Sequence, residues 1–212
     1  YASGFKNAAV IIIDGAGELE ATTHWQVSNG QFLKLLSLDQ TPHSLGFMFE
    51  GVCKYLGFNS DDAGKVMGLA SYSNSHISPF PSLQLTQDGY RICFPQEIFD
   101  EVSKKYSTKP NYYLMDLVKD LWIVYCKNLY GNLRSLSGSP TEDVRKDIAM
   151  RLQKTLETAL LHSAAQLRSQ TGEKNLCLAG GVALNCSANG QLERAGIFDN
   201  VYIYPSSNDA GV

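Results

Sequence analysis

Two glycine-containing stretches of this 212-residue sequence carry residue types that suit a ligand site. The first is residues 14–18, Asp-Gly-Ala-Gly-Glu, directly after an apolar run. The second is the pair Gly180-Gly181, which follows another apolar run and precedes Asn185. Glycine lacks the Cβ that blocks a close approach, and the first turn of a following helix presents unpaired N–H groups. Both stretches therefore fit a site for an anion or a nucleotide, although a glycine pair also makes a plain tight turn.

The elements predicted around these stretches are those of an α/β domain. The predicted strands are, in order, residues 8–13, 20–27, 31–38, 176–179 and 201–204. The first is a continuous apolar run, typical of a strand buried on both faces. Ser28-Asn29-Gly30 is a strong hairpin signal, so the first three strands form a meander. The last two strands flank a predicted helix over 182–195, which makes a βαβ unit with polar loops where ligands bind in such folds.

Helices are predicted in the middle of the chain. Residues 44–56 have an apolar helical face and a stop at Gly57, and residues 112–130 form a mostly apolar helix. The longest helix begins at the capping pattern 139–142 and ends before Gly172. Residues 73–138 read as an insertion, with a small hairpin turning at residues 87–89. The resulting β-β-β-α-β-α-β order is that of a ribonuclease-H-like half-domain, as in the actin, sugar-kinase and heat-shock ATPases.

Bulk composition excludes several classes of partner. A net charge of -3 with 18% charged residues gives no basic surface for nucleic acid or an anionic membrane. No apolar run approaches the roughly 20 residues that span a bilayer. The five dispersed cysteines form no C-x-x-C pair, which is typical of reduced thiols in a cytoplasmic protein. Because the chain starts at Tyr1 and stops at Val212 in a loop, we expect an internal piece of a longer protein.

Three groups of segments together resemble the nodulation-protein and antibiotic O-carbamoyltransferase family. They are residues 10–18; residues 44–46 with 64–70; and residues 176–185 with 205–211. The resemblance covers nearly the whole chain except residues 73–138, and the three groups in this order are far more specific than any one alone. A more distant relative of the same fold is the universal tRNA threonylcarbamoyladenosine-forming protein.

The resemblance implies a two-domain enzyme. A separate domain makes carbamoyl-adenylate from carbamoyl phosphate and ATP, and the domain seen here passes the carbamoyl group to a hydroxyl of a small-molecule acceptor. Family members carry a divalent metal, often iron, on a histidine-rich motif and two aspartates that match Asp14 and Asp209. The histidine motif would precede Tyr1. We therefore expect residues 1–212 to form one partial carbamoyltransferase domain that is inactive alone.

The resemblance also implies residue roles. Asp14 and Lys65 would be catalytic, and Asp14 and Asp209 would bind metal. The sequence places Lys65 in a loop, directly after Gly64. The nucleotide would contact Gly15, Gly17, Glu18, Gly68, Gly180, Gly181 and Asn185. Each role has a plainer alternative: Asp14 as a turn residue, Lys65 as a solvated surface lysine and Asp209 as a helix cap. Glu18 fits a substrate contact and a solvated loop acid equally well.

Two other functions stay open from the sequence. One is a kinase or ATPase of the same fold, and the other is a nucleotide-binding module without turnover. No Ser-His-Asp motif supports a serine nucleophile. His24, His76 and His162 read as structural, while the role of His43 is open. An exposed apolar face that would meet another half-domain could drive self-association as a homodimer.

Overall fold

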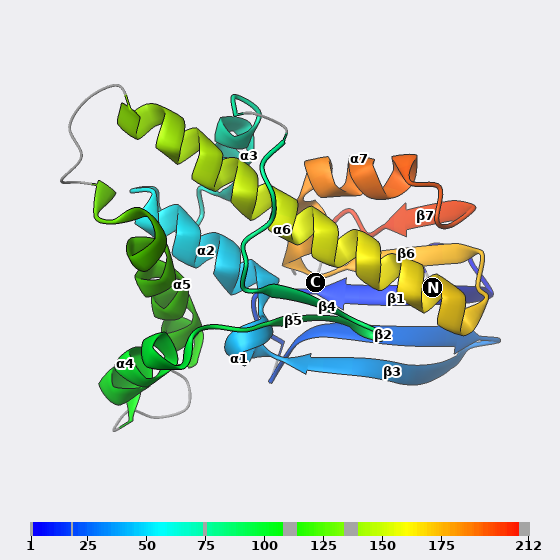
Figure 1. Ribbon diagram of the computed structural model, residues 1–212. Coiled ribbons are helices and arrows are strands. Elements are labelled where there is room, and N and C mark those ends of the chain that lie inside the picture. The colour runs from blue at the N-terminus through cyan, green and yellow to red at the C-terminus, as the bar shows by residue number, and fades with distance from the viewer. Residues whose placement is uncertain (1, 18, 74–75, 108–113, 134–139, 208–212) are drawn as a thin grey trace. The chain divides into compact units, whose positions relative to one another are not determined.

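A computed structural model of the chain describes residues 2–17, 19–73, 76–107, 114–133 and 140–207. Its main sheet has five strands in the order β3-β2-β1-β6-β7 (Figure 1). The strands are β1 (Asn7–Ile13), β2 (Glu20–Ser28), β3 (Gln31–Asp39), β6 (Asn175–Ala179) and β7 (Asn200–Ile203). A second sheet pairs β4 (Leu83–Thr86) with β5 (Gly89–Ile92). All five predicted strands and the predicted small hairpin are therefore confirmed.

Strand polarity confirms the predicted fold class. β2 runs antiparallel to both β1 and β3, whereas β1 is parallel to β6 and β6 is parallel to β7. The β2–β3 turn has positive φ at Asn29 (51°) and Gly30 (79°), the backbone that the Asn-Gly pair favours in a hairpin. A meander followed by parallel α-β-α-β connections is the ribonuclease-H-like half-domain.

The longer helices follow the predicted pattern, whereas several short ones were not predicted. They are α1 (Gln40–His43), α2 (Leu45–Tyr55), α3 (Ala63–Ala70), α4 (Gln96–Tyr106), α5 (Leu114–Tyr130), α6 (Pro140–Thr171), the 3-10 turn η3 (Gly181–Leu184) and α7 (Cys186–Arg194). α2, α5 and α6 confirm the predicted helices, although the expected cap at Ser139 and the start at 112–113 lie outside the described residues. α1, α3 and α4 were not predicted. In the part of the chain that the structure describes, no helix is long and apolar enough to cross a membrane.

The chain divides into two compact units. The first, which we call the sheet unit, comprises Tyr1–Gly46, Gln84–Arg91 and Leu156–Val212. The second, the helical unit, comprises Phe47–Leu83 and Ile92–Thr155. The expected insertion at residues 73–138 stays a prediction, and its hairpin residues 84–91 belong to the sheet unit.

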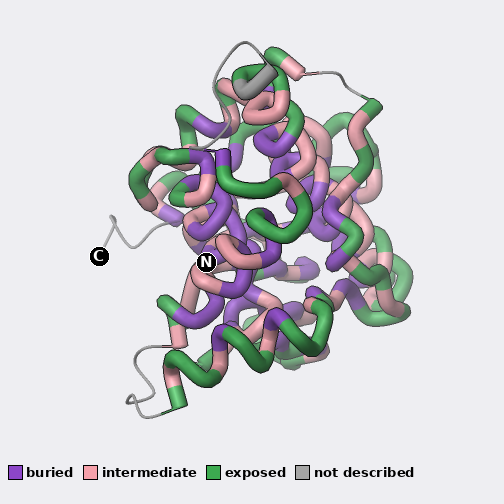
Figure 2. Tube along the Cα trace, turned by 60° about the vertical axis from the view of Figure 1, so that its left-hand side comes forward, coloured by how far each residue is buried: buried purple, intermediate pink, exposed green. Residues whose placement is uncertain are grey.

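One face of the main sheet is buried in the sheet unit. Figure 2 colours the chain by burial. Ala9, Ile11 and Ile13 on β1 and their neighbours Leu176 and Leu178 on β6 are at most 2% exposed. The C-terminal half of α6 contributes a buried stripe: Leu156, Ala159, Leu160, Ala164 and Leu167. The opposite side of β1 is more open, with Ile12 38% exposed. The prediction that β1 is buried on both faces is therefore wrong for this chain.

The helical unit has an aromatic core. The Trp122 ring lies 5.3 Å from Phe80, 5.0 Å from Phe94 and 5.7 Å from Tyr125 between centroids, in tilted or edge-on geometry. α2 approaches α5 closely, because a Cβ on Gly51 would lie 2.7 Å from the Lys119 carbonyl oxygen. Such edge-to-face aromatic contacts add to the burial energy of large rings. The aromatic cluster thus packs α5 against Phe80 and Phe94, and α2 meets α5 separately at Gly51.

His24 is a buried histidine on β2. This agrees with the structural role that the sequence predicted for it. It is 1% exposed, and its Nε2 has no hydrogen-bond partner among the described residues. The ring lies under the β4–β5 hairpin, where a Cβ on Gly89 would approach His24 Cε1 to 3.5 Å. Burial disfavours the charged ring and lowers the pKa of His24 to about 4, although the nearby Asp88 carboxylate acts in the opposite direction.

We predict that His24 makes the protein less stable in mild acid. The unfolded chain takes up the proton near pH 6.5 and the folded chain only near pH 4. Stability is therefore full above pH 6.5 and falls as the pH drops toward 4, by about 3 kcal/mol in total. Urea unfolding of wild type and His24→Gln between pH 4.5 and 7.5 measures this loss. The variant should show a flatter pH dependence, and His76→Gln, at an exposed histidine, should keep the wild-type one.

Candidate functional site

The carboxyl ends of β1 and β6 place the two glycine stretches side by side. These strands are parallel neighbours, with Ile12 paired to Ala179, so Asp14 and Gly180 both follow at the same sheet edge. Gly180 has φ +91°, and a Cβ on it would lie 2.2 Å from the Ile13 carbonyl oxygen. No real Cβ tolerates that distance. Gly180 is thus required by the turn itself, whatever else the site does.

Gly181 lies against the Asp14 side chain. A Cβ on Gly181 would lie 3.0 Å from Asp14 Oδ1, which also accepts a hydrogen bond from the Gly15 N–H at 2.6 Å. The Asp14 N–H donates to the Ala21 carbonyl oxygen at 2.8 Å. The half-buried carboxylate of Asp14 is therefore held at the junction of the two loops.

Residues 44–46 support the Asp14 loop from a third direction. A Cβ on Gly46 would lie 2.5 Å from both Cα and N of Gly15, so the two backbones are in close contact. Ser44 Oγ donates to the Gly15 carbonyl oxygen at 2.6 Å. Ser44 therefore fixes the Asp14 loop. Three segments far apart in the sequence meet here, all within the sheet unit.

Gly17 ties the Asp14 loop to the start of β2 and to α1. Its N–H donates to the Glu20 carbonyl oxygen at 2.7 Å, and its carbonyl oxygen accepts from Gln40 Nε2 at 3.1 Å. The loop backbone is thus fixed before any ligand arrives, which lowers the entropy that binding has to overcome.

Asn185 occupies a different local position from the predicted one. The sequence predicted a helix from Val182 with Asn185 in its first turn. Instead, η3 ends at Leu184 and Asn185 is the N-cap of α7, its Oδ1 accepting from the Ala188 N–H at 3.0 Å. Asparagine is among the preferred N-cap residues, so this signal was present in the sequence. A nucleotide contact by Asn185 stays a prediction.

Lys65 and Gly68 belong to the helical unit. The sequence predicted a loop at Lys65, but it lies in α3, where its Nζ pairs with Asp62 at 2.8 Å and its side chain is 68% exposed. A Cβ on Gly68 would meet nothing within 4 Å, leaving aside the helix's own nearby backbone. Their proposed roles with phosphate and nucleotide are not tested by this arrangement.

The described residues do not by themselves make a metal site. Glu18 and Asp209 lie outside the described residues, so the predicted pair of aspartates is represented by Asp14 alone. Within the described ranges, no group of three or more His, Cys, Asp or Glu side chains is placed to hold a metal ion. One carboxylate leaves most coordination positions of a divalent ion to other ligands.

Comparisons with known proteins cover the entire chain. Residues 1–212 match the family model described as "Carbamoyltransferase N-terminus". Nodulation protein NolNO of Sinorhizobium fredii is 33% identical over 99% of this chain and 27% of its own length, and nodulation protein NolO of Bradyrhizobium diazoefficiens is 31% identical over 99% and 34%. The chain thus spans about one third of the curated relatives it matches. The solved Lmo2764 protein of Listeria monocytogenes aligns with 99% of this chain and 56% of its own, at 9% identity and a TM-score of 0.43, a likeness too low to indicate function.

We predict that the two adjacent glycines respond differently to alanine. Gly180→Ala should cost about 3 kcal/mol or more, because its Cβ meets the Ile13 backbone in a left-handed conformation. Gly172→Ala is the matched control, with φ +68° and nothing within 4 Å, and should cost about 1–2 kcal/mol. Gly181→Ala should fold, since only the Asp14 side chain has to move. Denaturant unfolding measures all three, and equal losses at Gly180 and Gly172 would contradict the close approach.

Proposed function

Because the chain belongs to the carbamoyltransferase family over its whole length, we propose that it forms part of an O-carbamoyltransferase site. The proposed reaction moves a carbamoyl group from carbamoyl-adenylate, made from carbamoyl phosphate and ATP, to a hydroxyl of a small-molecule acceptor. The observation that carries this proposal is the convergence of Asp14–Gly15 with Gly46 and Gly180-Gly181. Ligands of open α/β sheets bind at the carboxyl ends of the strands, which is where these residues meet.

The nucleotide part of the proposal rests on backbone access. Gly15, Gly17 and Gly181 carry no side chain that would keep an adenylate away from the loops, and the Asp14 loop is already held by Ser44. Lys65 is the proposed phosphate ligand. The Lys65 side chain is 68% exposed in its ion pair with Asp62, and pairs with a solvated partner contribute only about 0–1 kcal/mol, so exchanging the carboxylate for a phosphate costs little.

The proposed transfer needs no protein nucleophile. The acceptor hydroxyl oxygen forms a bond to the carbamoyl carbon, the bond from that carbon to the AMP oxygen breaks, and AMP leaves with the electron pair. The hydroxyl proton is released. Negative charge gathers on the carbamoyl oxygen during the attack, and fixed N–H donors stabilise such charge because they need no reorganisation.

We propose metal binding by Asp14 only together with further ligands that lie outside the described residues. Asp14 would supply one carboxylate oxygen, and Asp209 and histidines from outside residues 1–212 would supply the rest. An asparagine in place of Asp14 keeps the shape of the side chain but binds a hard cation or iron more weakly. Metal content therefore reports on this proposal independently of turnover.

We predict that Asp14→Asn lowers the transfer rate roughly 100-fold in a full-length family protein containing residues 1–212. Product mass, AMP release and metal content by elemental analysis are measured together. Asp61→Asn, at an exposed aspartate of the helical unit, is the control and should behave as wild type. Wild-type rate and metal content in Asp14→Asn would remove Asp14 from the site. Release of ADP with a phosphorylated acceptor would instead identify a kinase.

The 212-residue chain alone should not transfer carbamoyl groups. Its described residues offer a single site carboxylate, and the nucleotide would contact only the part of the cleft that this chain supplies. The assay gives the purified chain carbamoyl-adenylate, Fe²⁺ and a panel of hydroxyl compounds. A product rate close to that of the full-length protein would show that residues 1–212 contain the whole catalytic site.

A further inference from the structure

β3 is an outer strand of the main sheet, and its outer backbone edge is unpaired among the described residues. In the described sheet, the strand order β3-β2-β1-β6-β7 leaves β3 with β2 as its only neighbour. No backbone hydrogen bond joins residues 31–38 to any described segment other than β2. The strand runs for nine residues without a proline, so its backbone can accept a further strand along the outer side.

The β2–β3 hairpin determines which backbone groups of β3 point outward. Its two-residue turn, Asn29-Gly30, lies between the paired residues Ser28 and Gln31, and a turn of this kind closes on a hydrogen-bonded pair. Hydrogen-bonded and non-hydrogen-bonded pairs alternate along an antiparallel ladder. The N–H and C=O groups of Phe32 and Lys34 therefore point away from β2. A register shift directly after Lys34 ends this regular pattern.

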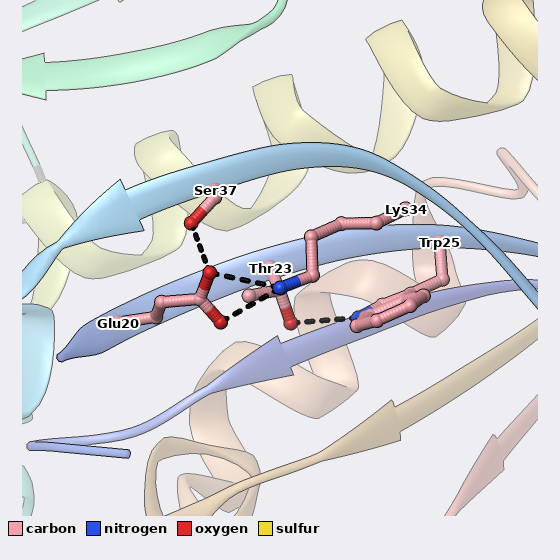
Figure 3. Close-up of polar contacts among 5 residues, drawn as sticks. All are labelled: Glu20, Thr23, Trp25, Lys34 and Ser37. Carbon is pink, nitrogen blue, oxygen red and sulfur yellow. Dashed lines mark hydrogen bonds and ion pairs between the residues drawn. The ribbon is translucent and has the colours of Figure 1, made fainter. Parts of the chain in front are cut away.

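The side chains that could block this edge are held over β2 instead (Figure 3). An outer strand is commonly protected by a lysine on its edge. Here Lys34 Nζ donates to both carboxylate oxygens of Glu20, at 2.8 and 3.0 Å, and lies 4.8 Å from the centroid of the Trp25 ring. Ser37 Oγ donates to the same carboxylate at 2.5 Å, and Trp25 Nε1 donates to Thr23 Oγ1 at 2.8 Å. Since Glu20 and Trp25 both belong to β2, these contacts draw the Lys34 and Ser37 side chains back over the sheet and leave the β3 edge open.

Leu33 is an exposed apolar side chain beside this edge. It pairs across the strands with Gln26, on the side of the sheet that buries His24, yet it is 58% exposed. A shallow cavity of about 600 Å³ lies next to it, lined by Gln26, Ser28, Gln31, Phe32 and Leu33. An uncharged lining with a leucine at the strand edge favours a partner that brings another apolar side chain to this point, rather than a charged one.

A second copy of β3 matches all of these features together. When two β3 strands lie antiparallel about a two-fold axis at Leu33, Phe32 of each copy faces Lys34 of the other, and their outward N–H and C=O groups bond reciprocally. Leu33 then lies opposite Leu33 of the second copy, at the ~5 Å Cβ separation of a directly opposed pair. The charge of each Lys34 is already paired with Glu20 of its own copy, so the two-fold axis brings no unpaired like charges together.

We propose that β3 is the pairing edge of a homodimer, in which two copies join their main sheets antiparallel along residues 31–35 about a two-fold axis at Leu33. A single pair of strands buries less than the ~1,200 Å² of a standard interface, so this dimer dissociates on dilution. The proposal does not depend on the proposed reaction, because no residue of the pairing edge belongs to the proposed site.

Substitutions at Leu33 supply the first test, in a full-length family protein containing residues 1–212. Sedimentation velocity at about 1 to 100 μM measures the dissociation constant. Wild type should dimerise in this range, whereas Leu33→Glu and Leu33→Lys should each weaken the dimer roughly tenfold or more, because the two-fold axis places like charges opposite one another. An equimolar mixture of the two variants should dimerise again. Leu85→Glu is the matched control, at a strand leucine that is 47% exposed and lies away from this edge, and should behave as wild type.

Hydrogen exchange on the unmodified full-length protein supplies the second test, which needs no variant to fold. The amides of Phe32 and Lys34 should exchange roughly tenfold faster after dilution from about 100 to about 1 μM, because only the dimer protects them. Peptides from the middle of β2 should exchange equally at both concentrations. A wild-type monomer at about 100 μM, a Leu33→Glu dimer as tight as wild type, a mixture that stays monomeric, or unchanged exchange at Phe32 and Lys34 would each overturn the proposal.

Discussion

The parallel pairing of β1 with β6 is the interaction on which the rest of the described site depends. The paired residues Ile12 and Ala179 are separated by most of the chain, and the pairing brings Asp14 and Gly180 to the same sheet edge. At that edge the chain turns so close to the Ile13 carbonyl that a side chain does not fit. The site is therefore built by backbone contact first, and the carboxylate of Asp14 is positioned by it.

The two faces of the same sheet are consequences of how its strands are connected. Because α6 and α7 return the chain across one face, the apolar residues that alternate onto the other face have no cover in the sheet unit. Ile11 and Ile12 are adjacent on β1, yet one is fully buried and the other is 38% exposed. A continuous apolar run indicates a strand whose two faces are both buried. It does not indicate which part of a polypeptide covers each face.

The fold was largely predictable because turn residues mark the ends of its strands. Ser28-Asn29-Gly30 sets the β2–β3 hairpin, and the apolar stripe of α6 repeats over many turns. α4 was missed because its buried contacts are few: Ile98 and Val102, four residues apart, are the buried pair. Lys65 lies between two glycines, which favour a loop by local propensity, yet the segment is helical. At the site, Asp14 and the Gly180 turn were recognisable singly, whereas the support from Ser44 and Gly46 required the tertiary structure.

The glycines also differ in what natural variation at each would reveal. Gly180 is constrained by the Ile13 carbonyl, so a family member that had lost all activity would still keep glycine there in order to fold. Gly64 and Gly68 on α3 are under no such constraint, since a methyl group at either would meet nothing beyond the helix's own backbone within 4 Å. Each glycine inside a helix costs about 1 kcal/mol relative to alanine. Neutral drift should therefore replace Gly64 and Gly68 with alanine readily, and lineages that retain them would reveal selection for something other than folding.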